Sequence, residues 1–119
     1  MITNKINIGQ NNNVTRAVAR FGMGQVVLHK LLHTRGVIID IDPVFLGSEA
    51  WYDEVALNRP AKDQPWYKVL VNNAHDESYV PEQNLTADSS DEQINHPLLE
   101  IYFDEFNKGH YKNTSWRLN

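Results

Sequence analysis

Short runs of apolar and β-branched residues, separated by polar turns, dominate the chain between residues 25 and 87. The runs 25–32, 34–42, 65–73 and 76–81 have the alternation and the valine and isoleucine content typical of strands, and a shorter run follows at 82–85. Pro43 ends the second run because proline cannot donate a hydrogen bond in a central ladder. Four or five short strands with little helix predict an all-β fold, a small β-barrel.

Turn residues and side-chain alternation predict how these strands pair. Residues 33–36 predict a hairpin turn in which Gly36 adopts a positive φ, and residues 72–75 predict a second hairpin loop. Because alternate residues of a strand share a face, one set of side chains is expected to point into the barrel and another to point away from it. The inward set is Val37, Ile39, Ile41, Val69 and Val71; the outward set is Ile38, Asp40 and Asp42.

Two segments depart from the strand pattern. The excursion at 45–64 is longer than a connection between two strands needs, so we expect it to be packed or functional. Residues 49–57 predict a short helix inside it, with Ser48 as its N-cap. After Pro97, apolar residues at helical spacing predict a C-terminal helical segment that continues to Phe106 and stops at Gly109.

The two ends of the chain are predicted to differ in structure from its centre. The chain has 119 residues, enough for one ordinary domain. Residues 1–20 contain the polar tract Asn11–Asn12–Asn13 and are predicted to form a flexible tail. We therefore expect one domain at 21–112, between this tail and a second one at 113–119.

Composition narrows the classes of protein. The formal net charge of −4 excludes a globally basic nucleic-acid binder, so only a local patch could contact phosphate. The absence of cysteine excludes disulfides and cysteine nucleophiles. No apolar stretch is long enough for a membrane helix, and the first residues lack the apolar run of a secretory signal. The expectation is a cytoplasmic protein without a membrane partner.

Charge is distributed unevenly along the chain. Residues 16–35 carry basic side chains and no acidic one, whereas residues 76–105 carry acidic side chains and no lysine or arginine. The basic segment predicts a weak, salt-sensitive DNA contact, and the alternative is a solvated surface that the acidic segment neutralises. The candidate DNA-binding residues are Arg16, Arg20, Lys30 and Arg35.

Catalytic and metal-binding patterns are weak. His29 and His33 have the spacing of metal ligands on a helix, but the sequence places them at a strand end and a turn. Asp40 and Asp42 share a strand face without a companion nucleophile motif. The sequence contains no phosphate-binding loop and no serine-nucleophile motif. We therefore expect no enzyme, no catalytic residue, no metal site and no cofactor.

Trp51 and Tyr52 are the candidate partner-binding residues. They lie in the long excursion, and partly exposed aromatic residues dominate the energetics of protein interfaces. The prediction is a contact with a partner protein or with a second copy of this protein. The alternative is that the pair covers the end of the barrel.

Four sequence blocks, taken together and in order, carry a resemblance to a known family. They are residues 21–30 (FGMGQVVLHK), 35–43 (RGVIIDIDP), 62–71 (KDQPWYKVLV) and 79–85 (YVPEQNL), with a weaker match at 96–111. In these blocks the chain resembles the heat-shock protein HspQ family, also described as the hemimethylated-DNA-binding, YccV-like domain.

The resemblance implies more than the residues do by themselves. It implies an SH3-like β-barrel and a cytoplasmic heat-shock protein of the stress response. It implies a role in degradation of denatured or specific proteins, as a non-enzymatic specificity factor whose partners are an ATP-dependent protease and its substrates. The alternative function that it implies is binding of hemimethylated DNA.

Overall fold

The computed structural model describes residues 4–7, 13–16, 18–56 and 58–115. The helices and strands are, in chain order, β1 (Asn4–Asn7), β2 (Asn13–Arg16), β3 (Val26–His29), β4 (Arg35–Asp42), α1 (Glu49–Val55), β5 (Trp66–Val71), β6 (Glu77–Pro81), the 3₁₀ turn η1 (Glu82–Asn84), β7 (Leu85–Ala87), α2 (Leu99–Tyr102), β8 (Glu105–Asn107) and β9 (His110–Lys112). The described part of the chain is mostly β, as the apolar runs predicted.

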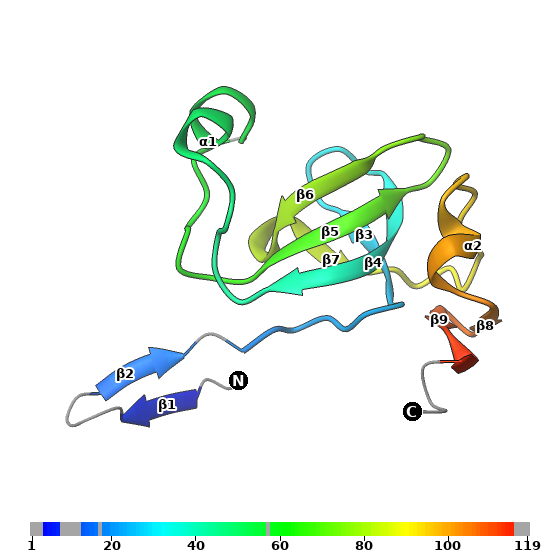
Figure 1. Cartoon of the computed structure of the whole chain (residues 1–119), viewed down its shortest axis with the longest axis horizontal. Helices are drawn as coiled ribbons and strands as arrows, with labels where there is room; N and C mark the ends of the chain where they lie inside the picture. The colour runs from blue at the N-terminus through cyan, green and yellow to red at the C-terminus, as the bar shows by residue number, and fades with distance from the viewer. Residues whose placement is uncertain (1–3, 8–12, 17, 57, 116–119) are drawn as a thin grey trace.

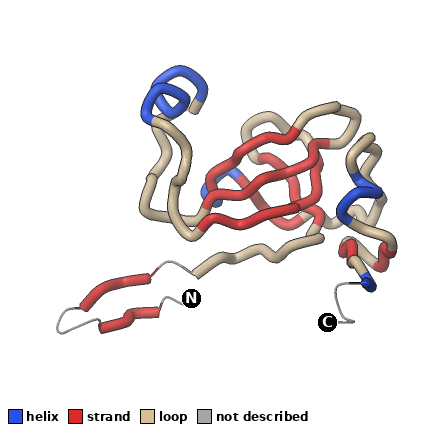
Figure 2. Tube along the Cα trace, in the orientation of Figure 1, coloured by secondary structure: helices blue, strands red, loops and turns tan. Residues whose placement is uncertain are grey.

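A five-stranded antiparallel sheet forms the centre of the molecule (Figures 1 and 2). Its strand order is β6-β5-β4-β3-β7, so neighbours in sequence are neighbours in space, apart from β7 beside β3. The strands β6 and β7 are its two edges and do not pair with each other, which makes the sheet open. The prediction of a closed barrel is therefore wrong: the strands were identified, but the ladder does not close.

A β-bulge in β4 corrects the predicted strand faces. Ile38 pairs with Val69 and Asp40 pairs with Lys68, which leaves Ile39 as the extra residue between them. An extra residue reverses the alternation beyond it, so Ile41 lies on the side of Ile38 and not on the side of Ile39. The prediction that Ile38 points away from the core is wrong, since Ile38 is fully buried.

The sheet carries a separate apolar core on each face. On one face, Ile38 and Val69 pack with Tyr67 and Val80, and Ile41 and Val71 lie against them. On the other, Val37 and Ile39 pack with Ile94, Phe103 and Tyr111 from the C-terminal segment. All five residues predicted to point inward contact a core, but they divide between two. The members of the first core are Phe21, Val27, Ile38, Tyr67, Val69, Val80 and Leu85.

The first hairpin turn also differs from its prediction. Gly36 lies within β4, where a Cβ would meet Cγ1 of Val69 at 2.4 Å. The positive φ falls instead on His33, at 59°. This glycine is needed for close approach between neighbouring strands, not for backbone freedom in a turn.

The C-terminal segment is a short helix followed by a hairpin. The helix α2 ends at Tyr102, so the predicted helix as far as Phe106 is wrong. Strands β8 and β9 pair next, and the two residues between them, Lys108 and Gly109, have φ of 48° and 81°. Two successive positive φ values are typical of a type I′ hairpin turn, so Gly109 serves a hairpin.

At the N-terminus, β1 and β2 form a two-stranded antiparallel sheet in which Asn4 pairs with Arg16. The sequence predicted a flexible tail over residues 1–20. The structure makes residues 13–16 extended. The predicted tail at 113–119 lies largely outside the described residues.

Candidate functional site

The excursion between β4 and β5 contains the predicted helix and folds against one end of the sheet. Helix α1 begins after Ser48, whose Oγ accepts a hydrogen bond from the Trp51 N–H at 3.0 Å. This N-cap satisfies a backbone donor that the first helical turn leaves unpaired. The predicted cap is confirmed, and it fixes the orientation of the helix that carries Trp51 and Tyr52.

Aromatic rings hold the excursion to the sheet. Phe45 lies centrally: its ring centroid is 4.9 Å from that of Trp66 and 5.3 Å from that of Tyr52. Trp51 contacts Phe45 and reaches Tyr79 of β6 at 5.7 Å. We call these five residues the aromatic cluster. Ring pairs at these distances each contribute about 0.5–1.5 kcal/mol beyond the burial of their area.

Trp51 and Tyr52 take different places in this cluster. Tyr52 is only 4% exposed, and its hydroxyl donates to the carbonyl of Pro60 at 2.5 Å. Lys62 lies over its ring, with Nζ 4.3 Å from the centroid. Tyr52 is thus an interior residue that orders the excursion, and its ring is not available at the surface. Trp51 remains half-buried.

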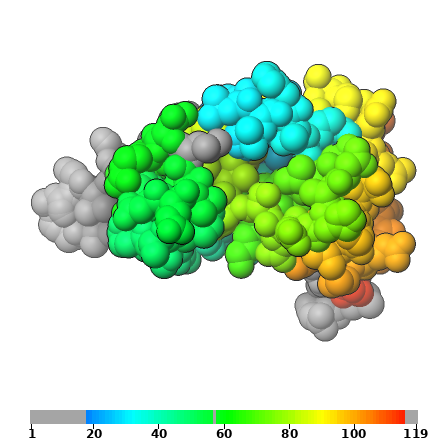
Figure 3. Space-filling view, turned by 90° about the horizontal axis from the view of Figure 1, so that it is seen from above, coloured from blue at the N-terminus to red at the C-terminus, as the bar shows by residue number. Residues whose placement is uncertain are grey.

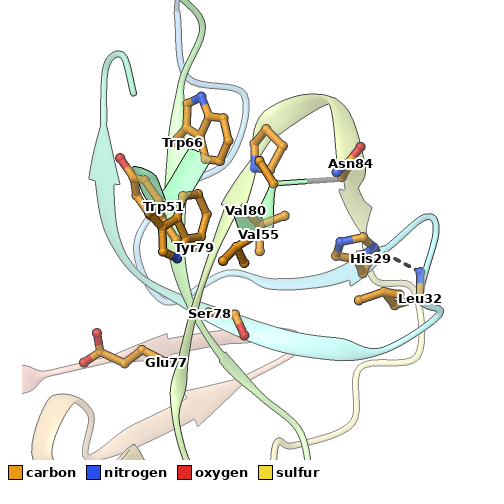
Figure 4. A pocket seen from close by; sticks show the side chains of 12 residues that line it. His29, Leu32, Trp51, Val55, Trp66, Glu77, Ser78, Tyr79, Val80 and Asn84 are labelled. Carbon is orange, nitrogen blue, oxygen red and sulfur yellow. Dashed lines mark hydrogen bonds between the residues drawn. The ribbon is translucent and has the colours of Figure 1, made fainter. Parts of the chain in front are cut away.

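Two hollows meet at Trp51 and Tyr79. One has a volume of about 330 Å³ and lies between α1, β6, η1 and the loop after β3 (Figure 4). The other, of about 530 Å³, lies between α1 and the sheet, with Leu46, Ser48, Lys68 and Asp42 in its walls. Both are more apolar than polar in lining, which suits the binding of apolar groups. We call the first the edge cavity.

Tyr79 joins the two hollows and is held by hydrogen bonds. Its hydroxyl donates to Oδ2 of Asp42 at 2.5 Å and accepts from the Leu46 N–H at 3.1 Å. Burial and the bond to Asp42 raise the pKa of Tyr79 to about 12. At neutral pH it is an uncharged donor. Asp42 is engaged in this bond, and Asp40 accepts from the backbone N–H of Ile41, so the two carboxylates have separate structural partners.

His29 lies at the other end of the edge cavity. Its Nδ1 accepts hydrogen bonds from the N–H groups of Leu31 and Leu32, both at 3.1 Å. Burial, together with the charge of His33, lowers the pKa of His29. The ring is therefore neutral at pH 7, with its proton on Nε2. Among the described residues, no group of three or more His, Asp or Glu is arranged to hold a metal ion.

The predicted DNA-binding residues are only partly brought together. The backbone N–H of Arg20 donates to Glu82 at 2.9 Å, and that of Lys30 donates to the Asn84 carbonyl at 2.8 Å. Both residues are exposed, so two cations flank η1. The side chain of Arg16 lies outside the described residues.

Arg35 is in a different place and has a structural role. Its Nη2 lies 3.2 Å from Oδ2 of Asp88, and the guanidinium also donates to the carbonyls of Glu92 and Gln93. Burial alone would raise the pKa of Asp88; hydrogen bonds from Ser90 and Arg35 outweigh it, so this pKa lies below its ordinary value. Through these contacts Arg35 attaches the segment after β7 to the sheet.

Sequence reasoning missed His29 and Asn84 as residues of a cavity. His29 was interpreted as a polar turn residue, and η1 was expected to be strand. No local signal identifies them, because the cavity is formed by segments that only tertiary structure brings together.

A known protein family matches most of this chain. No helix in the described ranges is long and apolar enough to cross a membrane. Residues 19–110 match the family model described as hemimethylated DNA-binding protein YccV-like, and this match covers the sheet, the excursion with α1 and nearly all of the C-terminal segment. The chain therefore belongs to the YccV-like family of hemimethylated DNA-binding proteins.

Proposed function

We propose that this protein is a non-enzymatic heat-shock factor of the cytoplasm that binds proteins and gives an ATP-dependent protease its specificity for denatured or particular substrates. The observation that carries the proposal is the half-buried Trp51 between two apolar hollows. A partly exposed tryptophan in a concave apolar surface is the residue type that contributes most to protein interfaces.

Exposed aliphatic side chains around Trp51 support binding of protein. Leu46 is 65% exposed in one hollow, and Val55 and Leu32 are 52% and 57% exposed in the other. Contiguous apolar exposure of this kind is uncommon on a monomer and marks interaction sites. The Tyr79 hydroxyl and the Asp42 carboxylate are engaged in a structural hydrogen bond with each other, which favours binding over catalysis.

A reconstituted degradation assay tests this function. A fluorescently labelled, denatured substrate is incubated with the host's ATP-dependent protease and ATP, with and without the protein. We expect faster degradation with it, and Trp51→Ser should remove most of the stimulation. Sedimentation of the same samples measures any self-association.

Ile101→Ser is the matched control, because Ile101 is 68% exposed on α2 at the opposite end of the sheet. It should stimulate degradation like the unaltered protein. Equal stimulation by the Trp51 and Ile101 variants would show that the two hollows are not the binding surface. No stimulation by the unaltered protein would contradict the function itself.

The family match favours DNA binding as a second function. Arg20 and Lys30, which flank η1, are the available phosphate contacts, whereas Arg35 is committed to Asp88. Arg20→Glu with Lys30→Glu should weaken binding to a hemimethylated duplex and reduce its salt slope by roughly two units. Lys108→Glu, a distant reversal in the β8–β9 turn, is the control. Unchanged affinity in the double variant would exclude this pair as the contact.

A further inference from the structure

The edge cavity follows the open edge of β6. Five consecutive residues, Glu77–Pro81, line it. Side chains of consecutive residues point to opposite faces of a sheet, so a cavity that touches all five lies along the edge of the strand and not over one face. Figure 3 shows the surrounding parts, with α1 (green) on one side and the loop after β3 (cyan) on another.

The hydrogen-bond register shows which groups of β6 face the cavity. The Glu82 N–H donates to the Pro65 carbonyl, so this pair is a hydrogen-bonded one. Because hydrogen-bonded pairs alternate along an antiparallel ladder, Val80 and Ser78 also bond to β5. The N–H and C=O groups of Tyr79 and Glu77 must then point outward, and no described residue bonds to them. Such an edge is a template for another strand.

Two buried polar side chains face the same cavity without partners. His29 and Asn84 are each 8% exposed, and neither His29 Nε2 nor the Asn84 amide has a hydrogen-bond partner among the described residues. Figure 4 shows both beside Leu32, at the end of the cavity opposite Trp51. Among the described residues, Arg35 Nε is the only fully buried side-chain nitrogen or oxygen without a partner, so the His29 and Asn84 groups reach the surface of the cavity and are available to a ligand that enters it.

His96 shows which kind of partner a histidine held in this way can take. The two rings have the same local geometry, since His96 Nδ1 accepts from the Leu98 N–H at 3.1 Å. In His96 the other nitrogen, Nε2, lies 3.1 Å from the backbone carbonyl of Asp76. His29 has the equivalent donor and lacks the carbonyl. An amide such as that of Asn84 both donates and accepts, so it suits the same kind of partner, a peptide group.

The charge of the cavity excludes a polyanion as its preferred occupant. Among the described residues that line it, Glu77 is the one acidic residue, His29 is neutral, and there is no lysine or arginine. A peptide that is neutral or carries a basic residue complements this surface, whereas a nucleic acid needs cations for its phosphates.

We propose that the edge cavity binds an extended peptide segment of a partner protein as an added strand on β6. The segment's backbone pairs with Glu77 and Tyr79, one apolar side chain enters beside Val55 and Leu32, and a carbonyl accepts from His29 Nε2. This mode of recognition obtains affinity from main-chain hydrogen bonds and specificity from pockets for alternate side chains. The inference rests on the proposed function and names the chemistry of its ligand.

The test measures fluorescence anisotropy of a labelled peptide with alternating valine and threonine and a lysine at each end. A second peptide of the same sequence carries N-methyl groups on alternate backbone nitrogens along the pairing edge. The first should bind and the second should bind at least tenfold more weakly. Equal binding of both would overturn the added strand, because N-methylation removes the backbone donors and keeps every side chain.

Matched variants locate the site. Val55→Trp fills the cavity and should weaken binding at least tenfold, whereas Ala50→Trp, on the same helix outside the cavity lining, should not. Glu77→Pro removes one outward N–H and should weaken binding about fivefold relative to Glu77→Thr, which keeps that N–H. Far-ultraviolet circular dichroism verifies folding. Binding that is the same in each variant and its control would overturn the proposal.

His29→Asn offers a check that needs no change in β6. An asparagine oxygen can still accept from the Leu31 and Leu32 N–H groups, but the Nε2 donor is lost. Weaker binding of the peptide is expected, by about fivefold. An oligonucleotide that contains a methylated adenine tests the other kind of occupant. If it binds the unaltered protein but not Val55→Trp, and the peptide does not bind, the cavity is a base pocket and the proposal is overturned.

These experiments distinguish a failure of the peptide site from a failure of the proposed function. If the unaltered protein stimulates degradation but does not bind the peptide, the inference fails and the proposed function stands. If it binds the peptide at the edge cavity and does not stimulate degradation, the proposed function fails and the peptide site stands.

Discussion

The excursion that carries α1 and the C-terminal segment at 94–112 flank the same sheet, at opposite ends (Figures 1 and 3). The C-terminal segment buries Ile94, Phe103 and Tyr111 in a core with Val26, Val37, Ile39 and Leu70. The excursion buries Tyr52 and leaves Leu46 and Val55 largely exposed. The C-terminal segment completes the interior of the protein, whereas the excursion leaves two hollows between itself and the sheet.

Backbone contacts explain part of this difference. The Tyr111 N–H donates to the Gly24 carbonyl at 2.6 Å, and the Val26 N–H donates to the Gly109 carbonyl at 3.0 Å. A Cβ at Gly24 would lie 2.0 Å from the Tyr111 carbonyl oxygen, so the two backbones are in direct contact there. The excursion is joined to the sheet mainly through ring contacts, which tolerate space between backbones. Stability and binding thus belong to different segments.

The largest effect is expected where the C-terminal segment meets the sheet. Phe103→Ala should lower the free energy of unfolding by about 3–5 kcal/mol, because Phe103 is buried and its loss leaves a cavity. Urea denaturation followed by circular dichroism measures this. A loss below about 1 kcal/mol would mean that this segment does not complete the core, and the comparison between the segments would fail.

A smaller effect is expected in the excursion, and it should differ between its two aromatic neighbours. Tyr52→Ser should cost about 2–3 kcal/mol, because a buried ring is lost, whereas Trp51→Ser should cost about 1 kcal/mol for its ring contacts. The same urea titrations compare the two. Equal costs would show that Trp51 is as structural as Tyr52, and its assignment to a binding surface would be contradicted.

The smallest effect is expected at the Tyr79 hydroxyl and depends on pH. Tyr79→Phe removes the hydrogen bond to Asp42 and should cost about 1 kcal/mol at pH 7. The pKa of Tyr79 is raised to about 12, so the unfolded chain ionises first, near pH 10. The contribution of the hydroxyl is present below pH 10 and is lost between pH 10 and 12. The urea midpoints of the unaltered protein and Tyr79→Phe should therefore lie closer together at pH 11 than at pH 7. The same difference at both pH values would contradict this pKa.

Local features of the fold were predictable from the residues near them. The strand runs follow from alternation and β-branched content, and the start of α1 follows from Ser48 three residues before Trp51. The β8–β9 hairpin was missed because its apolar residues also fit helical spacing. There, pairing of Phe106 with Tyr111 outweighs helix periodicity.

The candidate site was less predictable than the strands. Trp51 was identified from its residue type and its place in a long excursion, but Tyr52, adjacent to it, proved to be interior. Arg35 was predicted to contact DNA, and no sequence signal indicated that it pairs with Asp88, a residue far along the chain. His29 and Asn84 gave no signal, since their significance lies in the absence of partners, which a sequence does not display.

By itself, the sequence determined the family, the β-rich class, the order of the strands along the chain and the helix within the excursion, because these depend on residue type and short-range periodicity. Tertiary structure alone decided the bulge at Ile39, the separation of two cores, the pairing of Arg35 with Asp88 and the open edge of β6. Each of these depends on which distant segments pack together. A one-residue change of register, or one buried ion pair, alters the free energy of the whole assembly while leaving the local pattern of residues unchanged.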